Sequence, residues 1–180
     1  YTAPVKLTDS AVVQAIAVKD GFDASHISKE FVRFVDRAQN GFKYTVFEGE
    51  WTERPDRETI KAVSSGTVFH YDVNKIKRRG DMVAILYEGF LDITIEGEYT
   101  FYAKANNGCV LNIDGRDIVD NGGYSGELET EGSCVLAPGR HPISIFYFEN
   151  EGSERMDLEI KGPGLPLQTL PEQMIFMRDK

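Results

Sequence analysis

The chain has 180 residues, of which 41% are hydrophobic and 27% charged, a composition typical of a soluble globular protein with one medium domain and at most a small appendage. No apolar run approaches the roughly 18 residues of a membrane-spanning helix, so we expect no membrane insertion. Its 29 acidic and 20 basic residues give a net charge of −9, which disfavours nucleic acid and anionic membranes and favours a neutral ligand.

The first residues predict a short two-stranded appendage. One alternating strand lies in YTAPVKLTDSAVVQAIAVKDG, which ends in a turn at Gly21, and a second lies in SHISKEFVRF. Two strands alone are marginally stable, so this segment must pack on the main domain or be the end of another one. We therefore predict residues 1–37 as the last strands of a small β domain plus linker, and residues 38–180 as the main domain. The chain opens without a methionine or a signal peptide, and we expect that an upstream part has been removed.

Apolar residues alternate with polar ones from Phe42 onward, and glycines and asparagines bound the runs. No long window keeps helical spacing, so the sequence predicts an all-β, antiparallel β-sandwich. An Asp-Gly pair at Asp114 and Gly115 predicts a tight hairpin. The expected strands are Phe42–Trp51, Gly66–Tyr71, Val83–Ile95, Gly97–Ala105, Cys109–Ile113, Asp117–Val119, Gly126–Leu136, His141–Glu149 and Met156–Lys161.

The segments between the strands have their own signals. Thr52–Val63 contains Pro55 and is expected to form a loop with a helical turn, and Asn74–Asp81 reads as a solvated basic loop. The proline-rich stretch GPGLPLQTLPEQMIF suggests an extended tail that covers an edge of the sandwich with Leu170, Met174 and Ile175.

Strand alternation assigns several large side chains to faces. We expect Tyr99, Phe101, Phe146, Phe148 and Trp51 in the core, with Tyr102 and Tyr147 on the opposite faces. Cys109 and Cys134 are in phase with apolar neighbours and should point inward, either as two buried thiols or as a disulfide if their strands are adjacent.

Catalytic signatures are missing from the sequence. It contains no GxSxG, HExxH, phosphate-loop or dinucleotide-binding motif, and the three histidines are scattered. Glu127, Glu129 and Glu131 alternate along one strand and could imitate a catalytic carboxylate pair, but they read more simply as a solvated strand face. We therefore expect no catalytic residues in this chain.

An ordered series of motifs between Phe42 and Phe176 resembles the PA-fourteen family, the β-sandwich lectin module named for the anthrax protective antigen. The series is FKYTVFEGEW, YEGFLDITIEGEYTFYAKANNG, VLNIDGRDIVDNGG, LAPGRHPISIFYFENEG and LEIKGPG. The resemblance implies a sugar-binding module of the kind that occurs in bacterial glycoside hydrolases and fungal adhesins.

The leading segment YTAPVKLTDSAVVQAIAVKDGFDAS resembles the end of the small β domain at the C-terminus of chitobiase and β-hexosaminidase-like enzymes. Together the two resemblances imply a parent that is a bacterial glycoside hydrolase, secreted to the extracellular space, the periplasm or the cell surface. The partners they imply are a glycan or polysaccharide and the catalytic domain of the parent chain.

Calcium-dependent members of the family hold the ion with two adjacent aspartates before a glycine, and this chain has Asn106-Asn107-Gly108 there. Asparagine keeps a carbonyl oxygen but removes the formal charge, and calcium affinity depends on carboxylates. We therefore expect no tight calcium binding and a trans peptide bond, and we keep Asn106, Asn107 and Asp114 as candidates for a weak site. Alternatively, the two asparagines only turn the chain.

The next loop, Asp120-Asn121-Gly122-Gly123-Tyr124, combines a carboxylate, an amide and an aromatic ring. Such groups read sugar hydroxyls and cover the apolar face of a pyranose, although a glycine-rich loop can also be only a turn. The predicted function is a carbohydrate-binding accessory module, and the alternative is a structural spacer or protein-interaction module with a degenerate sugar site. The candidate sugar-binding residues are Asn106, Asn107, Gly108, Asp120, Asn121 and Tyr124.

Overall fold

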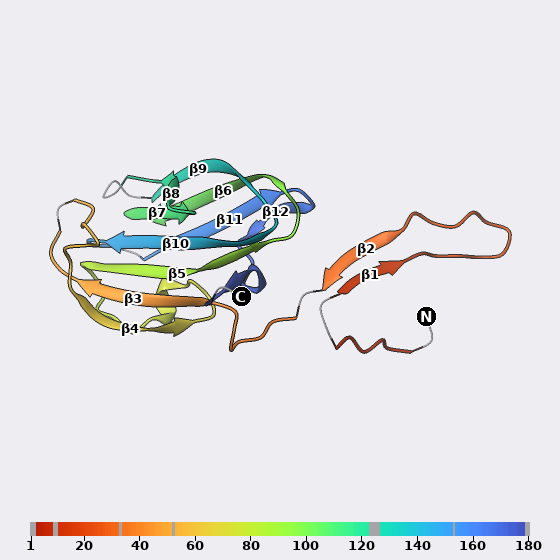
Figure 1. Ribbon diagram of the computed structural model, residues 1–180, viewed down its shortest axis with the longest axis horizontal. Helices are drawn as coiled ribbons and strands as arrows, with labels where there is room; N and C mark the ends of the chain where they lie inside the picture. The colour runs from red at the N-terminus through yellow and green to blue at the C-terminus, as the bar shows by residue number, and fades with distance from the viewer. Residues whose placement is uncertain are drawn as a thin grey trace. The chain divides into compact units, whose positions relative to one another are not determined.

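Figure 1 shows the computed structural model of the chain, which describes residues 3–8, 11–32, 34–51, 53–122, 127–152 and 154–178. The chain divides into two compact units, Tyr1–Asp36 and Arg37–Lys180. No helix among the described residues has the length and apolar character needed to cross a membrane.

The first unit contains one antiparallel hairpin. Strand β1 (Ala11–Ala15) pairs with β2 (Ser28–Val32), in a register that sets Ala11 opposite Val32 and Ala15 opposite Ser28. Gly21 turns the chain between them with a φ of 81°. The predicted two-stranded appendage is therefore confirmed.

The second unit is an antiparallel sandwich of two sheets, as predicted (Figure 1). Within the described part of the chain, the large sheet has the order β4-β3-β5-β10-β7-β8, with β13 beside β5, and the small sheet has the order β12-β11-β6-β9. The elements are β3 (Phe42–Glu48), β4 (Ala62–Val68), η1 (Val73–Lys75), β5 (Val83–Ile93), β6 (Gly97–Asn106), β7 (Gly108–Ile113), β8 (Arg116–Asp120), β9 (Glu127–Leu136), β10 (Gly139–Glu149), β11 (Met156–Gly162), β12 (Leu165–Thr169), η2 (Glu172–Met174) and β13 (Ile175–Phe176).

The main core lies between the sheets and follows the alternation of the sequence. Alternate residues of β5, such as Ile85 and Tyr87, face alternate residues of β6, such as Tyr99 and Phe101, and all four are buried. The predicted hairpin between β7 and β8 is also confirmed, because Asp114 and Gly115 have φ angles of 52° and 77° and set Ile113 opposite Arg116.

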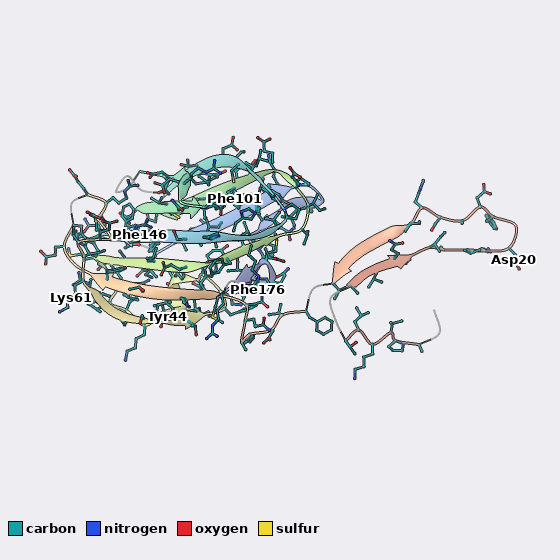
Figure 2. The ribbon with its side chains drawn as sticks, viewed as in Figure 1. Asp20, Tyr44, Lys61, Phe101, Phe146 and Phe176 are labelled. Atoms are coloured by element: carbon teal, nitrogen blue, oxygen red, sulfur yellow. The ribbon has the colours of Figure 1, made fainter. Side chains whose placement is uncertain are left out.

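A second hydrophobic cluster covers part of the outer face of the large sheet. It consists of Phe47, Ala84, Val110, Phe146 and Phe148, with Trp51, Ile60 and Leu86 packed against it. Figure 2 labels Phe101 from the main core and Phe146 from this outer cluster.

The expected faces of β10 were therefore wrong in part. Tyr147 lies in the main core with 0% exposure, whereas Phe146 and Phe148 belong to the outer cluster. Trp51 is half-buried against that cluster and does not lie in the main core. The reason is that the loop after β3 folds over the sheet, so both faces of β10 are covered from Ile145 to Glu149.

Two other segments differ from the expectation. Strand β4 spans Ala62–Val68 and not Gly66–Tyr71, because it is a mostly exposed edge strand whose sequence carries little hydrophobic alternation. The C-terminal tail forms β12, which carries Pro166 at the edge of the small sheet, and β13, which pairs with β5. Its Leu170, Met174 and Ile175 are buried in the main core.

The two cysteines lie on different sheets, Cys109 on β7 and Cys134 on β9, and both thiols are free. Cys109 is fully buried and Cys134 half-buried. Burial raises the pKa of the Cys109 thiol to about 12, so this group stays protonated and unreactive at neutral pH.

Candidate functional site

Three connections of the sandwich meet at one end of the large sheet, here called the loop end. They follow β6 at Asn106, β8 at Asp120 and β10 at Glu149. The strand registers set Tyr147 opposite Cys109 and Asp120 opposite Val110, so the start of β7 lies beside the ends of β8 and β10 (Figure 1). Five of the predicted sugar-site residues, Asn106, Asn107, Gly108, Asp120 and Asn121, therefore come to the same end of the fold. Tyr124 lies outside the described residues.

Asn107 makes the turn between β6 and β7. Its φ is 64°, a conformation that asparagine tolerates better than most residues, and the Asn106–Asn107 peptide bond is trans. The Asn107 side chain is only 7% exposed, and its Nδ2 donates to Oε1 of Glu149 at 3.2 Å. Asn106 is half-exposed, and its backbone N–H donates to the Arg155 carbonyl oxygen at 3.0 Å. The turn is thus bonded to the end of β10 and to the segment between β10 and β11.

Gly108 allows this turn to lie against the aromatic ring of Phe148. A Cβ at Gly108 would lie 1.8 Å from Cζ of Phe148, a distance that no side chain tolerates. The position is therefore occupied by glycine for packing, and its backbone holds Asn107 in place.

Glu149 is the residue of the loop end that sequence reasoning missed. Its side chain is completely buried, Oε2 accepts a hydrogen bond from the Tyr147 hydroxyl, and Oε1 accepts one from Asn107. Burial raises the pKa of this carboxyl; Glu154 and Asp81 raise it further, while the Tyr147 hydroxyl and Arg78 oppose the shift. The available signal was its position two residues after Tyr147 and four after Ile145, in phase with the inward-facing residues of β10.

Arg78 is the cation whose charge opposes the rise in the pKa of Glu149. Its side chain is only 6% exposed, and Nη1 lies 3.2 Å from Oε1 of Glu154. The same guanidinium donates to the carbonyl oxygens of Val73, Arg79 and Gly80. The expectation of a wholly solvated basic loop was therefore wrong for Arg78, which fixes the loop before β5.

Asp120 and Asn121 have opposite surroundings. Asp120 is exposed, and its carboxylate pairs with Nη1 of Arg54 at 2.6 Å and accepts from the Gly122 N–H at 2.9 Å. Asn121 is 2% exposed; its Oδ1 accepts from the Cys109 N–H at 2.5 Å, and its own N–H donates to the Cys109 carbonyl at 3.1 Å. Its Nδ2 finds no hydrogen-bond partner within the described part of the chain. Asn121 therefore joins β8 to β7, and Asp120 faces outward.

The calcium candidate Asp114 lies apart from the two asparagines. Strand β7 has six residues between Asn107 and Asp114, which separates them by roughly 20 Å at the usual rise of a strand. Asp114 instead bonds to His141, with its Oδ2 at 2.7 Å from Nδ1, and His141 Nε2 lies 2.8 Å from the Ala137 carbonyl oxygen.

The oxygen donors of the loop end fit calcium poorly. Both carboxylate oxygens of Glu149 and the Oδ1 of Asn121 already accept hydrogen bonds from the protein. Calcium takes six to eight oxygens, usually with several carboxylates. In the described ranges no cluster of three or more histidine, cysteine or acidic residues could hold a metal ion.

A family comparison matches residues 38–168 to the PA14 domain. A comparison with curated proteins finds no significant match.

Solved structures share the fold at low sequence identity. A PA14 sugar-binding domain from an RTX adhesin superposes with a TM-score of 0.62 at 14% identity, covering 77% of this chain and 99% of that one. The A domain of epithelial adhesin 6 from Candida glabrata, solved with Galβ1-3GlcNAc, gives 0.60 at 12% identity, covering 78% and 88%. An anti-sigma factor domain-containing protein gives 0.62 at 15% identity and covers 78% of this chain, which spans about half (48%) of that protein. At sequence identities this low, the similarity to these solved structures shows a shared fold only.

Proposed function

Because the chain belongs to the PA14 domain family, we propose that it is a non-catalytic carbohydrate-binding module whose sugar site is the loop end. The observation that carries the proposal is the convergence of the connections after β6, β8 and β10, which brings an amide and a carboxylate to one end of the sandwich. Asn106 and Asp120 supply these groups. From the sequence alone we propose Tyr124, which lies outside the described residues, as the aromatic residue for the apolar face of a sugar ring.

The other candidate residues act as the scaffold of this site. Asn107 bonds to Glu149, Asn121 bonds to the backbone of Cys109, and Gly108 gives room to Phe148. These three positions hold the loops in place, and we assign them no direct contact with sugar. A site held rigidly before binding loses less entropy when the ligand arrives.

Sugar binding in this proposal needs no calcium ion. The Asn106-Asn107 pair carries no charge, and the nearest buried carboxylate, Glu149, is engaged by Tyr147 and Asn107. Asp120 and the Asn106 amide then contact hydroxyls directly. Calcium bound weakly through Asn106 and Asn107 is the alternative that a chelator tests.

The first experiment is a glycan-array screen of the full chain with calcium and again with a chelator. We expect binding that persists in chelator, and we expect Asn106→Ala and Asp120→Ala each to weaken it about tenfold, because each removes a polar contact with the sugar. Glu98→Ala is the matched control, since Glu98 is an exposed polar residue on β6 outside the loop end. Binding lost in chelator would contradict the metal-free site, and no binding in either condition would contradict the sugar-binding function.

One observation favours a second candidate function, a structural spacer or protein-interaction module. Asn107 and Asn121 are both buried and bonded to their own neighbours, as expected where a former sugar site has become structural. In that case the array would show no glycan binding, either for the unmodified chain or for the Asn106→Ala and Asp120→Ala variants.

We further propose that the module belongs to a secreted bacterial glycoside hydrolase and that its catalytic domain precedes Tyr1. The proposal is supported by the β1–β2 hairpin, whose sequence resembles the end of the small domain of chitobiase-like enzymes. Sequencing the reading frame upstream of Tyr1 tests it: a hydrolase catalytic domain behind a secretion signal is expected, and any other domain there would contradict it.

A further inference from the structure

The outer face of the large sheet carries a groove at some distance from the loop end. The groove has a volume of about 620 Å³, with Glu88 and Ser144 in its floor and Arg57, Gly115 and Met177 in its walls. A second hollow of about 360 Å³ shares Arg57 and continues past Phe146. Volumes of this size accommodate small ligands.

A row of polar side chains crosses the floor of this groove, here called the polar row. The strand registers set Lys43 opposite Glu88, Glu88 opposite Ser144, Ser144 opposite Asn112 and Asn112 opposite Asp117. The row therefore takes one residue from each of the neighbouring strands β3, β5, β10, β7 and β8. With adjacent strands about 4.8 Å apart, it spans roughly 19 Å, which suits a chain ligand better than a single small molecule.

Most members of the polar row have unused hydrogen-bonding groups. Within the described residues, Lys43, Glu88 and Ser144 of the polar row form no side-chain hydrogen bond or ion pair, and neither does Arg57 in the wall of the groove. Asn112 donates to Asp117 at 2.9 Å and keeps its amide oxygen for another partner. An ammonium, a guanidinium, a carboxylate, a hydroxyl and an amide are thus open to a ligand.

Apolar surface lies on both sides of the polar row. On one side is the half-buried Leu86, which lies opposite the buried Phe146; on the other side the half-buried Phe90 lies opposite the exposed Pro142. Leu86 and Phe90 are half-buried and contribute to the floor. A ligand that lies along the row would touch polar groups at its centre and apolar groups at its edges. Sugar rings, with hydroxyls at the rim and C–H groups on the faces, match this pattern.

The charges of the lining are balanced. The two hollows together contain three cations, Lys43, Arg54 and Arg57, and three anions, Asp56, Glu88 and Asp117. A balanced lining offers no net attraction to a polyanion or a polycation, and the whole chain carries a net charge of −9. A neutral ligand rich in hydroxyl groups is therefore favoured over a nucleic acid or a charged peptide.

We propose that this groove is a second carbohydrate-binding site, which takes a neutral oligosaccharide along the polar row. The inference rests on the proposed carbohydrate-binding function but assigns part of it to a surface separate from the loop end. Arg54 connects the two, since it lines the second hollow and pairs with Asp120. A long glycan can reach both sites, which raises its apparent affinity above that of either site alone.

The test is an NMR titration of the full, isotopically labelled chain with neutral hexasaccharides, namely cellohexaose, xylohexaose and N-acetylchitohexaose. We expect at least one of them to shift the amide signals of Lys43, Glu88, Asn112 and Ser144. Glu88→Ala should weaken this binding about tenfold because it removes a charged hydrogen-bonding group from the floor. Its matched control is Glu131→Ala, which removes an exposed strand carboxylate from β9 of the small sheet.

The position of the shifts separates this inference from the proposed function. Shifts confined to Asn106, Asn107 and Asp120 would overturn the groove and leave the loop-end site standing. Shifts confined to the groove, abolished by Glu88→Ala and unaffected by Asn106→Ala, would support the groove and count against the loop end. No shift with any of the three hexasaccharides, or equal losses with Glu88→Ala and Glu131→Ala, would overturn the groove.

Discussion

At Gly108 the backbone of β7 passes so close to Phe148 that a Cβ would lie 1.8 Å from the ring. We predict that Gly108→Ala lowers the free energy of unfolding by about 3 kcal/mol, because the ring must move within a packed cluster. Gly80→Ala is the control, since a Cβ there meets nothing within 4 Å. Urea unfolding of both variants checks this, and equal midpoints for the two would contradict it.

Tyr87 places a hydroxyl in the main core without a protein partner among the described residues. An unsatisfied buried hydroxyl is costly, so Tyr87→Phe should raise the free energy of unfolding by about 1 kcal/mol. Tyr71→Phe should lower it by a similar amount, because the Tyr71 hydroxyl donates to the Leu158 carbonyl at 3.0 Å. Thermal unfolding compares the pair. A loss of stability in both variants would show that Tyr87 has a partner in solution.

The residues of the loop end show what the sequence can predict about a site. The order of the motifs was enough to predict that Asn106, Asn107 and Asp120 lie at one end of the fold. It was not enough to predict which side chains point inward, because Asn107 and Asn121 turn toward partners that are distant in the chain. Glu149 was missed because the sequence analysis placed Tyr147, and with it the alternate residues of β10, on the face opposite the core.

At the scale of strands, alternation predicted which residues share a face but not which face is covered. In β10 the alternation correctly placed Phe146 and Phe148 on one face and Tyr147 on the opposite face. It wrongly assigned Phe146 and Phe148 to the main core, where Tyr147 lies. Both faces of the second half of this strand, from Ile145 to Glu149, are buried. The small sheet covers one face, and the loop after β3 covers the other through contacts of Trp51 and Ile60 with the sheet. When a distant loop packs on a strand, the sequence of that strand shows no periodic pattern of apolar residues that would predict it.

The pair of His141 and Asp114 holds the hairpin between β7 and β8 to the start of β10. Partial burial lowers the pKa of His141, but the Ala137 carbonyl and the Asp114 carboxylate raise it by more, so the net pKa lies above its ordinary value. Because the folded-state pKa is the higher one, the stabilisation is complete below the unfolded-state pKa of about 6.5 and is lost as the pH rises through the folded value.

We therefore predict that Asp114→Asn destabilises the protein more at about pH 5.5 than at about pH 8.5. Urea unfolding across this range measures the difference. Subtracting the variant from the unmodified protein removes the contribution of Glu149, which both share. Asp157→Asn, which removes an exposed carboxylate from β11, is the control and should show no such trend. A difference that grows with pH would contradict the assignment.

At the scale of the whole molecule, the stabilising interactions are divided unequally between the two units. Every residue of the main core and of the outer cluster lies between Phe42 and Ile175, within the second unit. Among its described residues the first unit has a single hairpin, and two strands alone bury too little apolar surface for independent stability. We infer that the second unit, residues 37–180, folds without the first.

This inference predicts that a chain beginning at Arg37 keeps the melting temperature of the full chain. Hydrophobic burial dominates the free energy of unfolding, and the deletion leaves both clusters complete. Differential scanning calorimetry of the two chains measures the difference, and for a protein of this size a loss of 1 kcal/mol lowers the melting temperature by about 2–4 °C. A decrease larger than that would mean that the hairpin packs on the sandwich and belongs to it. An unchanged value would support the assignment of the hairpin to a unit separate from the sandwich.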